Sequence, residues 1–173
     1  MKVKVINIIQ PEQIRSLQFQ LIELLGACIN EGASLGFYAP ADAKRLTSYW
    51  QGVEASVAQK KRSLYAIFHD DMLIASVQLV PCQKQNGQHR AEVEKLVVHP
   101  QVQRQGLARK LMAALEADAL QQGIKLLFLD TQTGDKSELF YQALGYSKSG
   151  EIPKFVTDSN GTFSSTSYYY KLL

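Results

Sequence analysis

The chain has 173 residues, of which 46% are hydrophobic and 20% are charged, and its mean hydropathy is -0.14. This balance excludes a largely disordered chain, and the length is that of one folded domain, residues 1–173. The 19 basic and 16 acidic side chains give a net charge of +3 and are scattered along the chain, so we expect no nucleic acid as a partner.

The first residues indicate a cytoplasmic protein. The apolar stretch within residues 1–10 is too short for the core of a signal peptide, and Pro11 interrupts it. No apolar run approaches the length of a membrane span, so we expect no membrane as a partner. Cys28 and Cys82 have no potential metal ligands at a suitable spacing, so we expect core or surface thiols and no metal.

The first third of the chain predicts a strand followed by two helices. Apolar residues alternate over residues 3–8, which predicts an opening strand. A helix is expected to begin at Pro11, because apolar residues then recur every three or four positions. Residues 32–40 should end this helix. A second helix follows, with basic residues 60–62 near its C-terminal end, where the helix dipole favours them.

The middle of the chain predicts two antiparallel hairpins. Residues 63–68 and 72–80 are rich in strand formers and flank a short polar turn. Residues 81–89 then lead into a strand over 90–98. Pro100 ends that strand, because proline has no amide hydrogen and restricts the residue before it.

The last part of the chain predicts one parallel unit and a final hairpin. A strand followed by a crossover helix and another strand almost always places the two strands parallel. The predicted elements are a helix over 106–121 ended by Gly123, a strand over 125–130, a helix over 136–144, and a hairpin over 156–173. The sequence therefore predicts one domain of the α/β class.

The turn before the helix over 106–121 is the most informative segment. The first amides of a helix have no intrahelical partner and the helix dipole makes that end positive, so this turn favours an anion. Gly106 and Ala108 would let phosphate oxygens approach the backbone, and positive charge is nearby on Arg104, Arg109 and Lys110. The two small residues could instead serve tight packing against the sheet, and their spacing leaves both possibilities open.

Two motifs resemble those of the GNAT family of N-acetyltransferases. Gln103-x-x-Gly106-x-Ala108 is similar to the family's motif A, [QR]-x-x-G-x-[GA], and residues 138–146 resemble its motif B. Nearly the whole chain is similar to tabtoxin-resistance-type members. The resemblance implies the GNAT fold: a central, mixed, mostly antiparallel sheet flanked by helices, with one parallel strand–helix–strand unit.

The resemblance also implies an activity. We expect direct transfer of the acetyl group of acetyl-CoA to a primary amine of a small molecule, such as a toxin or an antibiotic-like amino compound, with a role in resistance or detoxification. Two alternatives are a protein or peptide N-acetyltransferase and a CoA-binding regulatory module without catalysis. Family members frequently dimerise, so residues 164–170 could pair across a homodimer interface or could end the monomer's own sheet.

By resemblance, acetyl-CoA binds mainly to backbone groups of the turn and of the strand before it. The family often has an asparagine where this chain has Gly134, and Ser137 or Thr131 could replace its contact with the cofactor. The cofactor-binding residues implied are Leu96, Val97, Val98, Gln103, Arg104, Gln105, Gly106, Leu107, Ala108, Arg109, Lys110, Ser137 and Tyr141.

Acetyl transfer to an amine requires that the amine is neutral. A lysine-like amine has a pKa of about 10.4, so a base or a desolvating environment must remove its proton. The resemblance places Glu92 as the base. Asp130 at the end of the neighbouring strand is a second candidate and Glu94 a third. Glu92 and Asp130 could instead be edge carboxylates that cap a backbone group or pair with a basic side chain.

Tyr141 stands where the family has the general acid that protonates the departing thiolate, although a tyrosine on an apolar helix face is also typical of a core. We expect no covalent enzyme intermediate, because neither cysteine lies on these elements. By resemblance, four aromatic residues could line the acceptor pocket, although an aromatic helix face is more often part of the core. They are Phe37, Tyr38, Tyr49 and Trp50.

Overall fold

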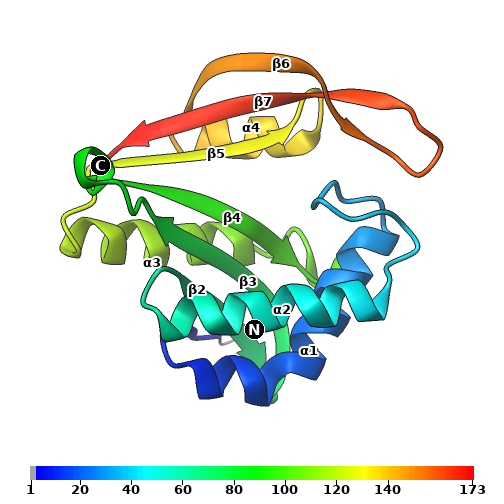
Figure 1. Ribbon diagram of the computed structural model, residues 1–173, viewed down its shortest axis with the longest axis horizontal. Helices are drawn as coiled ribbons and strands as arrows, with labels where there is room; N and C mark the ends of the chain where they lie inside the picture. The colour runs from blue at the N-terminus through cyan, green and yellow to red at the C-terminus, as the bar shows by residue number, and fades with distance from the viewer. Residues whose placement is uncertain (1–2) are drawn as a thin grey trace.

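A computed structural model describes residues 3–173 (Figure 1). Its elements are β1 (Val5–Ile8), α1 (Pro11–Asn30), α2 (Ala43–Ala58), β2 (Ser63–His69), β3 (Met72–Pro81), β4 (Arg90–Val98), α3 (Leu107–Gln121), β5 (Leu126–Gln132), α4 (Lys136–Ala143), β6 (Ser147–Thr157) and β7 (Phe163–Leu172). Short 3-10 turns occupy Gln85–Gly87 and Pro100–Val102. None of the described helices combines the length and the apolar character needed to cross a membrane.

One seven-stranded sheet runs through the molecule in the order β1-β2-β3-β4-β5-β7-β6. Strands β4 and β5 are parallel, and the other neighbouring pairs are antiparallel. The predicted fold class, with a mixed, mostly antiparallel sheet and a parallel β4-α3-β5 unit, is therefore confirmed.

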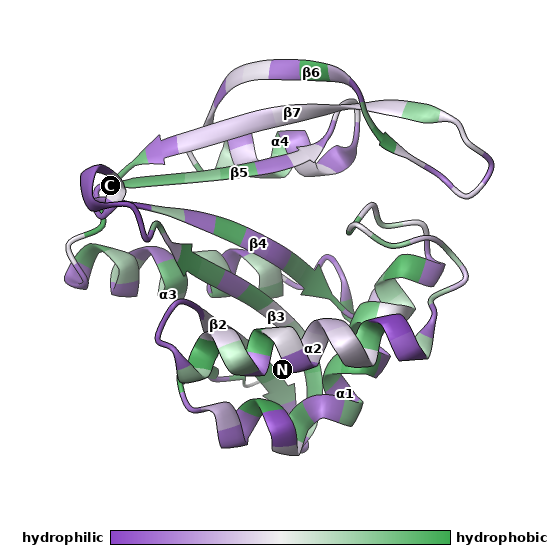
Figure 2. Ribbon diagram, viewed as in Figure 1, coloured by the Kyte–Doolittle hydropathy of each residue, from purple (hydrophilic) through white to green (hydrophobic). Residues whose placement is uncertain are grey.

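Helices lie on both faces of the sheet (Figure 1). Helices α1 and α2 lie on one face, and α3 and α4 lie on the other (Figure 1). Successive side chains of a strand point to opposite faces, so Leu64 and Ala66 of β2 pack with α1 and α2, while Tyr65 and Ile67 pack with α3. Strands buried on both faces are continuously apolar, as the hydropathy of β3 shows (Figure 2).

The final hairpin is longer than the sequence predicts. It was expected to span residues 156–173, but β6 begins at Ser147, so the prediction was wrong for the residues between. β6 is an edge strand whose residues are nearly all exposed, so it lacks the alternation of apolar and polar residues that marks a half-buried strand. Pro153 adds a further misleading signal, although proline is tolerated at a sheet edge.

The other boundaries of helices and strands differ from the predicted ones by a few residues. β1 begins at Val5, Gly106 precedes α3 as its N-terminal cap, and β5 extends to Gln132. The C-terminal strand over residues 164–170 pairs with β5 on one side and with β6 on the other. Of the two alternatives for this segment, it therefore belongs to the monomer's own sheet.

Candidate active site

Strands β4 and β5 separate along their length. They pair only at their first residues, Arg90 with Leu126, Ala91 with Leu127 and Glu92 with Phe128. Beyond this point β4 remains paired with β3, whereas β5 remains paired with β7, and the two strands diverge (Figure 1). The edge of β4 that faces β5 therefore has no strand partner after Glu92.

A β-bulge interrupts β4 where the strands diverge. Ser76 pairs with Val97 and Gln78 pairs with Glu94, so two residues of β4, Lys95 and Leu96, lie opposite a single residue of β3. Lys95 has a φ of 50°, which is uncommon for a residue with a side chain. A bulge bends the strand and changes the direction of its side chains. The Lys95 side chain therefore does not follow the alternation of its neighbours between the two faces of the sheet.

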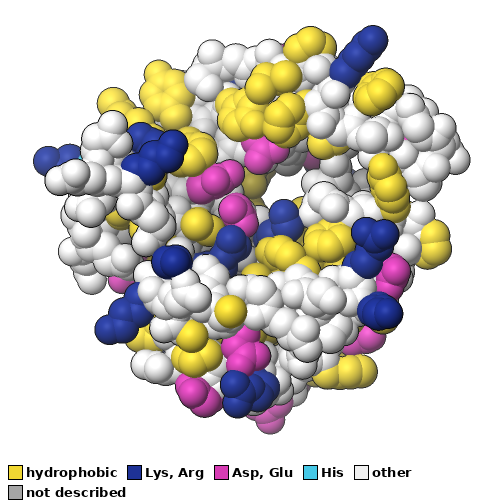
Figure 3. Space-filling model, viewed as in Figure 1, with side chains coloured by type: hydrophobic (Ala, Val, Ile, Leu, Met, Phe, Trp, Pro, Cys, Tyr) yellow, Lys and Arg dark blue, Asp and Glu magenta, His cyan; other side chains and the backbone are white. Residues whose placement is uncertain are grey.

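A cavity of about 570 Å³ lies between the diverging strands, within the size range of small-molecule sites. The space-filling view shows this face hollowed, with acidic and basic side chains close to the opening (Figure 3). Its walls come from the second half of β4, the end of β5, the start of α4, the β6–β7 hairpin and the loop after α1. The lining residues include Glu94, Lys95, Asp130, Ser137, Tyr141 and Phe155.

The turn before α3 presents unpaired amides. In the described chain, the backbone N–H groups of residues 103–109 make no hydrogen bond, whereas Lys110 N donates to Gly106 O at 3.1 Å. The turn is exposed except at Leu107, which is buried, and at Ala108, which is half-buried. These unpaired donors lie at the N-terminus of a helix, next to the cavity wall at Gln103, and are suited to bind an anion.

Backbone conformation explains the glycine in this turn better than packing does. Gly106 has a φ of 77°, in the left-handed region that favours glycine. No heavy atom lies within 4 Å of the position that a Cβ would take there. Tight packing against the sheet, the alternative that the sequence left open, therefore does not require this glycine.

The backbone groups of β4 that are expected to bind the cofactor are not equally available. Leu96, Val97 and Val98 all line the cavity. However, the Val98 carbonyl already accepts hydrogen bonds from Cys28 Sγ at 3.4 Å and Gln103 Nε2 at 3.2 Å. Burial raises the pKa of Cys28 to about 11, so its thiol stays protonated and donates. Leu96 and Val97 are thus the more available positions.

The three candidate carboxylates have different surroundings. Glu94 and Asp130 line the cavity, whereas Glu92 lies at its base, on the last residue pair that joins β4 to β5. Burial raises the pKa of Glu92, and the charges of Glu94 and Asp130 raise it further. Burial also raises the pKa of Asp130. Within residues 3–173, Glu94 forms an ion pair, whereas Glu92 and Asp130 form none.

A buried polar network holds Glu94. Arg62 Nη1 lies 2.7 Å from Glu94 Oε2 and also donates to Gln78 Oε1. The Gln78 side chain is fully buried and donates from Nε2 to the Tyr49 hydroxyl at 2.9 Å. Sequence reasoning missed Arg62 and Gln78. The signal available was a glutamine in the otherwise apolar stretch of β3, because a buried polar group requires partners.

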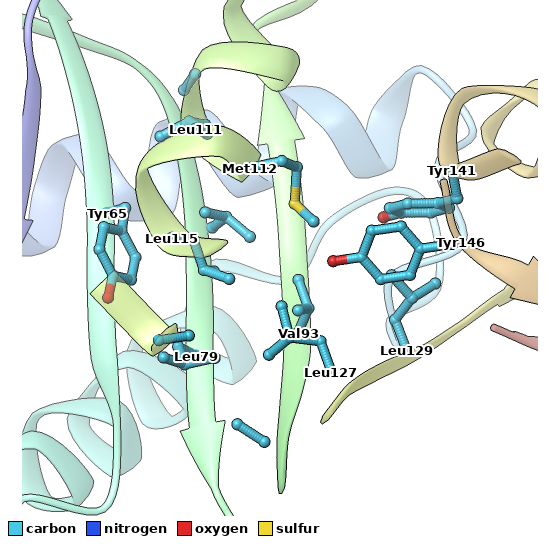
Figure 4. Packing of buried hydrophobic residues seen from close by; sticks show 14 of the residues in the cluster. Tyr65, Leu79, Val93, Leu111, Met112, Leu115, Leu127, Leu129, Tyr141 and Tyr146 are labelled. Carbon is cyan, nitrogen blue, oxygen red and sulfur yellow. The ribbon is translucent and has the colours of Figure 1, made fainter. Parts of the chain in front are cut away.

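Tyr141 is both part of the core and part of the cavity wall. Its side chain is 8% exposed and extends from α4 toward β4, where Val93 lies (Figure 4). Its ring packs against Phe140 and Tyr146, with centroids 5.4 and 5.8 Å apart. The hydroxyl has no hydrogen-bond partner in the part of the chain that the structure describes, and burial together with the charge of Asp130 raises its pKa. The two expectations for this residue are thus compatible.

Two hydroxyls lie beside the position where the family often has asparagine. Thr131 Oγ1 and Ser137 Oγ are 2.7 Å apart and both line the cavity. Asp135 caps α4 by accepting from Ser137 N at 3.0 Å. Gly134 N instead donates to Glu138 Oε2 at 2.7 Å. Either hydroxyl is therefore placed to contact a ligand between β5 and α4.

The aromatic side chains expected at an acceptor pocket do not line this cavity. Trp50 is 1% exposed and belongs to the core between the sheet and helices α1 and α2. Phe37 packs edge-on against Tyr49 with ring centroids 5.4 Å apart. Phe155 lines the cavity instead and packs against Tyr168 at 5.9 Å. Phe155 was missed because residues 147–155 of β6 were not predicted as strand.

The described residues contain no group of three or more His, Cys, Asp or Glu side chains that could hold a metal ion.

Comparison with known sequences points to one family. The profile of the acetyltransferase (GNAT) family matches residues 28–146. An N-acetyltransferase from the hisH-hisA intergenic region of Azospirillum brasilense is 31% identical over 106 residues. This match covers 60% of the chain and 61% of that relative, so the chain spans about three fifths of the relative's length.

Solved structures share the fold over almost the whole chain. A GNAT acetyltransferase from Streptococcus pneumoniae has a TM-score of 0.79 at 15% identity, covering 99% of this chain and 100% of that one. An acetyltransferase from Salmonella typhimurium, solved with acetyl-CoA, has a TM-score of 0.75 at 12% identity, covering 100% and 95% of the two chains.

Proposed function

The chain belongs to the acetyltransferase (GNAT) family, and we propose that it transfers the acetyl group of acetyl-CoA directly to a primary amine of a small molecule. The observation that carries this proposal is the row of unpaired amides over residues 103–109, beside a cavity between two diverging strands. A cytoplasmic location and a detoxifying role belong to the same proposal, and only the composition and the sequence resemblance support them.

The residues present fit acetyl-CoA. The unpaired amides of the turn provide donors for a diphosphate, and the exposed side chains of Arg104, Arg109 and Lys110 add positive charge. The unpaired edge of β4 at Leu96 and Val97 offers main-chain groups to the amides of the pantetheine arm, in the manner of an added strand. The solved relative with acetyl-CoA supports this assignment.

Acetyl-CoA supplies a thioester, whose C–S bond breaks as the amine nitrogen forms its bond to the acetyl carbon. In this proposal Glu92 or Asp130 removes the proton that the amine must lose, directly or through a water. Both carboxylates lack an ion-pair partner among the described residues, and burial raises the pKa of each. A raised pKa brings a carboxylate closer to the working pH, which makes it a better general base.

Tyr141 is proposed to give its hydroxyl proton to the departing thiolate. The side chain lines the cavity and its hydroxyl has no hydrogen-bond partner among the described residues, so it is available to a ligand. A thiol has a pKa of about 8.5 and is already a tolerable leaving group, so this proton should contribute a factor of about 10² to 10⁴. Most of the remaining acceleration comes from holding amine and thioester together.

The shape of the cavity favours a small acceptor over a peptide. The β6–β7 hairpin contributes Phe155 and Thr166, and the loop after α1 contributes residues 31–36, so walls flank the acceptor side. A peptide acetyltransferase needs a groove that is open at both ends. A regulatory module that only binds CoA would need neither Tyr141 nor the unpaired carboxylates.

The test is turnover. Purified protein is incubated with acetyl-CoA and a panel of small primary amines, and thiol release is followed. A peptide library is analysed in parallel by mass spectrometry. Acetylation of small amines but not of peptides is the expected result. Acetylated peptides alone would establish the peptide alternative, and tight binding of acetyl-CoA in calorimetry without turnover of any amine would establish the regulatory one.

A further inference from the structure

Lys95 is a cavity-lining cation without a carboxylate partner. The neighbouring Glu94 is already neutralised by Arg62 at 2.7 Å. Lys95 itself lines the cavity, is half-buried, and forms no ion pair within the described range 3–173. An ammonium that has no carboxylate partner is available to bind an acid group of a ligand.

The bulge directs the Lys95 side chain to the face of the sheet that carries α2. Its Nζ lies 5.8 Å from the centroid of the Tyr49 ring in α2. It also lies 3.9 Å from the position that a Cβ of Gly36 would take, in the loop after α1. The unpaired amides of the turn lie beyond the C-terminal end of β4. Lys95 is thus on the acceptor side and not with the groups proposed for the diphosphate.

Lys95 and Asp130 line the same cavity. The charge of Lys95 lowers the pKa of both Glu92 and Asp130, which places its ammonium within electrostatic reach of both carboxylates. It contacts neither of them closely enough for an ion pair. Lys95 is therefore a positive group of the cavity that is separated in space from Glu92 and Asp130.

We propose that Lys95 binds an acid group of the acceptor, so that the acceptor is a primary amine that also carries a carboxylate, as in an amino acid. This inference rests on the proposed function. The amine end of such a molecule meets Glu92 and Asp130, and its carboxylate replaces solvent around Lys95. The same charge repels a diamine, whose second ammonium would lie in the same place.

The experiment compares matched acceptors. Each L-amino acid of a panel is assayed beside its carboxamide and beside the amine that lacks the carboxyl group, and kcat/KM is measured with saturating acetyl-CoA. For the best acceptor the acid should exceed the amide at least about tenfold, as one charge-assisted contact provides. Lys95→Met should bring this ratio close to one, Lys95→Arg should preserve it, and Lys95→Glu should reverse it.

Lys125→Met is the matched control, since it removes one positive charge from an exposed position outside the cavity lining. It should leave the ratio of acid to amide unchanged. A wild-type preference for amides or diamines overturns the inference, and so does a ratio that survives in Lys95→Met. In both cases the proposed function stands, because an amine is acetylated. Absence of turnover on every amine would instead remove the proposed function, and this inference with it.

Discussion

Arg62 Nη1 lies 2.7 Å from Glu94 Oε2, and this ion pair neutralises a carboxylate that stands two residues from Glu92 on the same face of β4. The pair sets the electrostatics of both candidate bases. The charge of Glu94 raises the pKa of Glu92 and of Asp130, while the charge of Arg62 lowers the pKa of Glu92.

The pH dependence of turnover should respond to the two partners in opposite directions. A base works deprotonated, so kcat/KM rises as the pH increases through its pKa. Arg62→Met removes a positive charge and should move this rise to higher pH, whereas Glu94→Gln removes a negative charge and should move it to lower pH. The measurement is kcat/KM from pH 5 to 9 for each variant.

The same profiles separate the two candidate bases. Arg62 acts on the pKa of Glu92 but is not among the groups that shift Asp130, whereas Glu94 shifts both. Movement with Arg62→Met identifies Glu92 as the base, and movement with Glu94→Gln alone identifies Asp130. If neither variant moves the profile, no carboxylate of this cluster acts as the base.

Tyr141→Phe should lower kcat by about 10²-fold, because the thiolate then leaves without a positioned acid. The ring and its contacts with Phe140 and Tyr146 remain, and the lost hydroxyl has no partner among the described residues, so the thermal unfolding temperature should hardly change. Steady-state kinetics and a thermal melt test this. Wild-type kcat in a folded variant would remove Tyr141 from the chemistry.

Gly106→Ala should weaken acetyl-CoA binding about tenfold or more, since an alanine resists the φ of 77° that sets the direction of the amides in this turn. Gly123 is the matched control. It has a φ of 80°, also has open space around its missing Cβ, and lies at the other end of α3. Both alanines should lower the free energy of unfolding by about 1 kcal/mol, but calorimetry should show normal acetyl-CoA binding only for Gly123→Ala.

Glu138 should support α4 in a pH-dependent way. Hydrogen bonds from Gly134 N at 2.7 Å and from the Tyr169 hydroxyl at 2.9 Å, together with Lys148, lower its pKa from 4.5 to about 2. A depressed carboxyl pKa adds stability above about pH 4.5, and this stability is lost as the pH falls toward 2.

Glu138→Gln should therefore lower the free energy of unfolding by about 1 kcal/mol or more at pH 7, with a smaller difference at pH 3. Denaturant unfolding at the two pH values measures this. An equal loss at both would show that the charge of Glu138 contributes nothing beyond packing.

The sequence predicted the parts of the molecule that depend on local pattern. Amphipathic helices, apolar strands and the turn at Gly106 follow from spacing and backbone preference, and they fixed the fold class and the position of the unpaired amides. Resemblance to a family added the candidate roles of Glu92 and Tyr141, and the predicted strand end at residue 130 added Asp130. Local pattern failed for β6, because an exposed edge strand has no buried face to impose alternation.

Relationships between distant segments could not be predicted. The pairing of Arg62 with Glu94 depends on how β2, β3 and β4 align, and no local signal records that register. The bulge at Lys95 is one extra residue in a strand of ordinary composition, yet it decides where the ammonium points. Which residues line the cavity between β4 and β5 likewise depends on the three-dimensional arrangement.

Amide NMR during titration with acetyl-CoA tests the central claim most directly. If the turn before α3 binds the diphosphate, the amide resonances of residues 104–109 should move in a saturable way, while that of Gly161 at the tip of the β6–β7 hairpin should stay in place. Saturable binding that leaves the resonances of the turn unmoved, or no binding at all, would contradict the account.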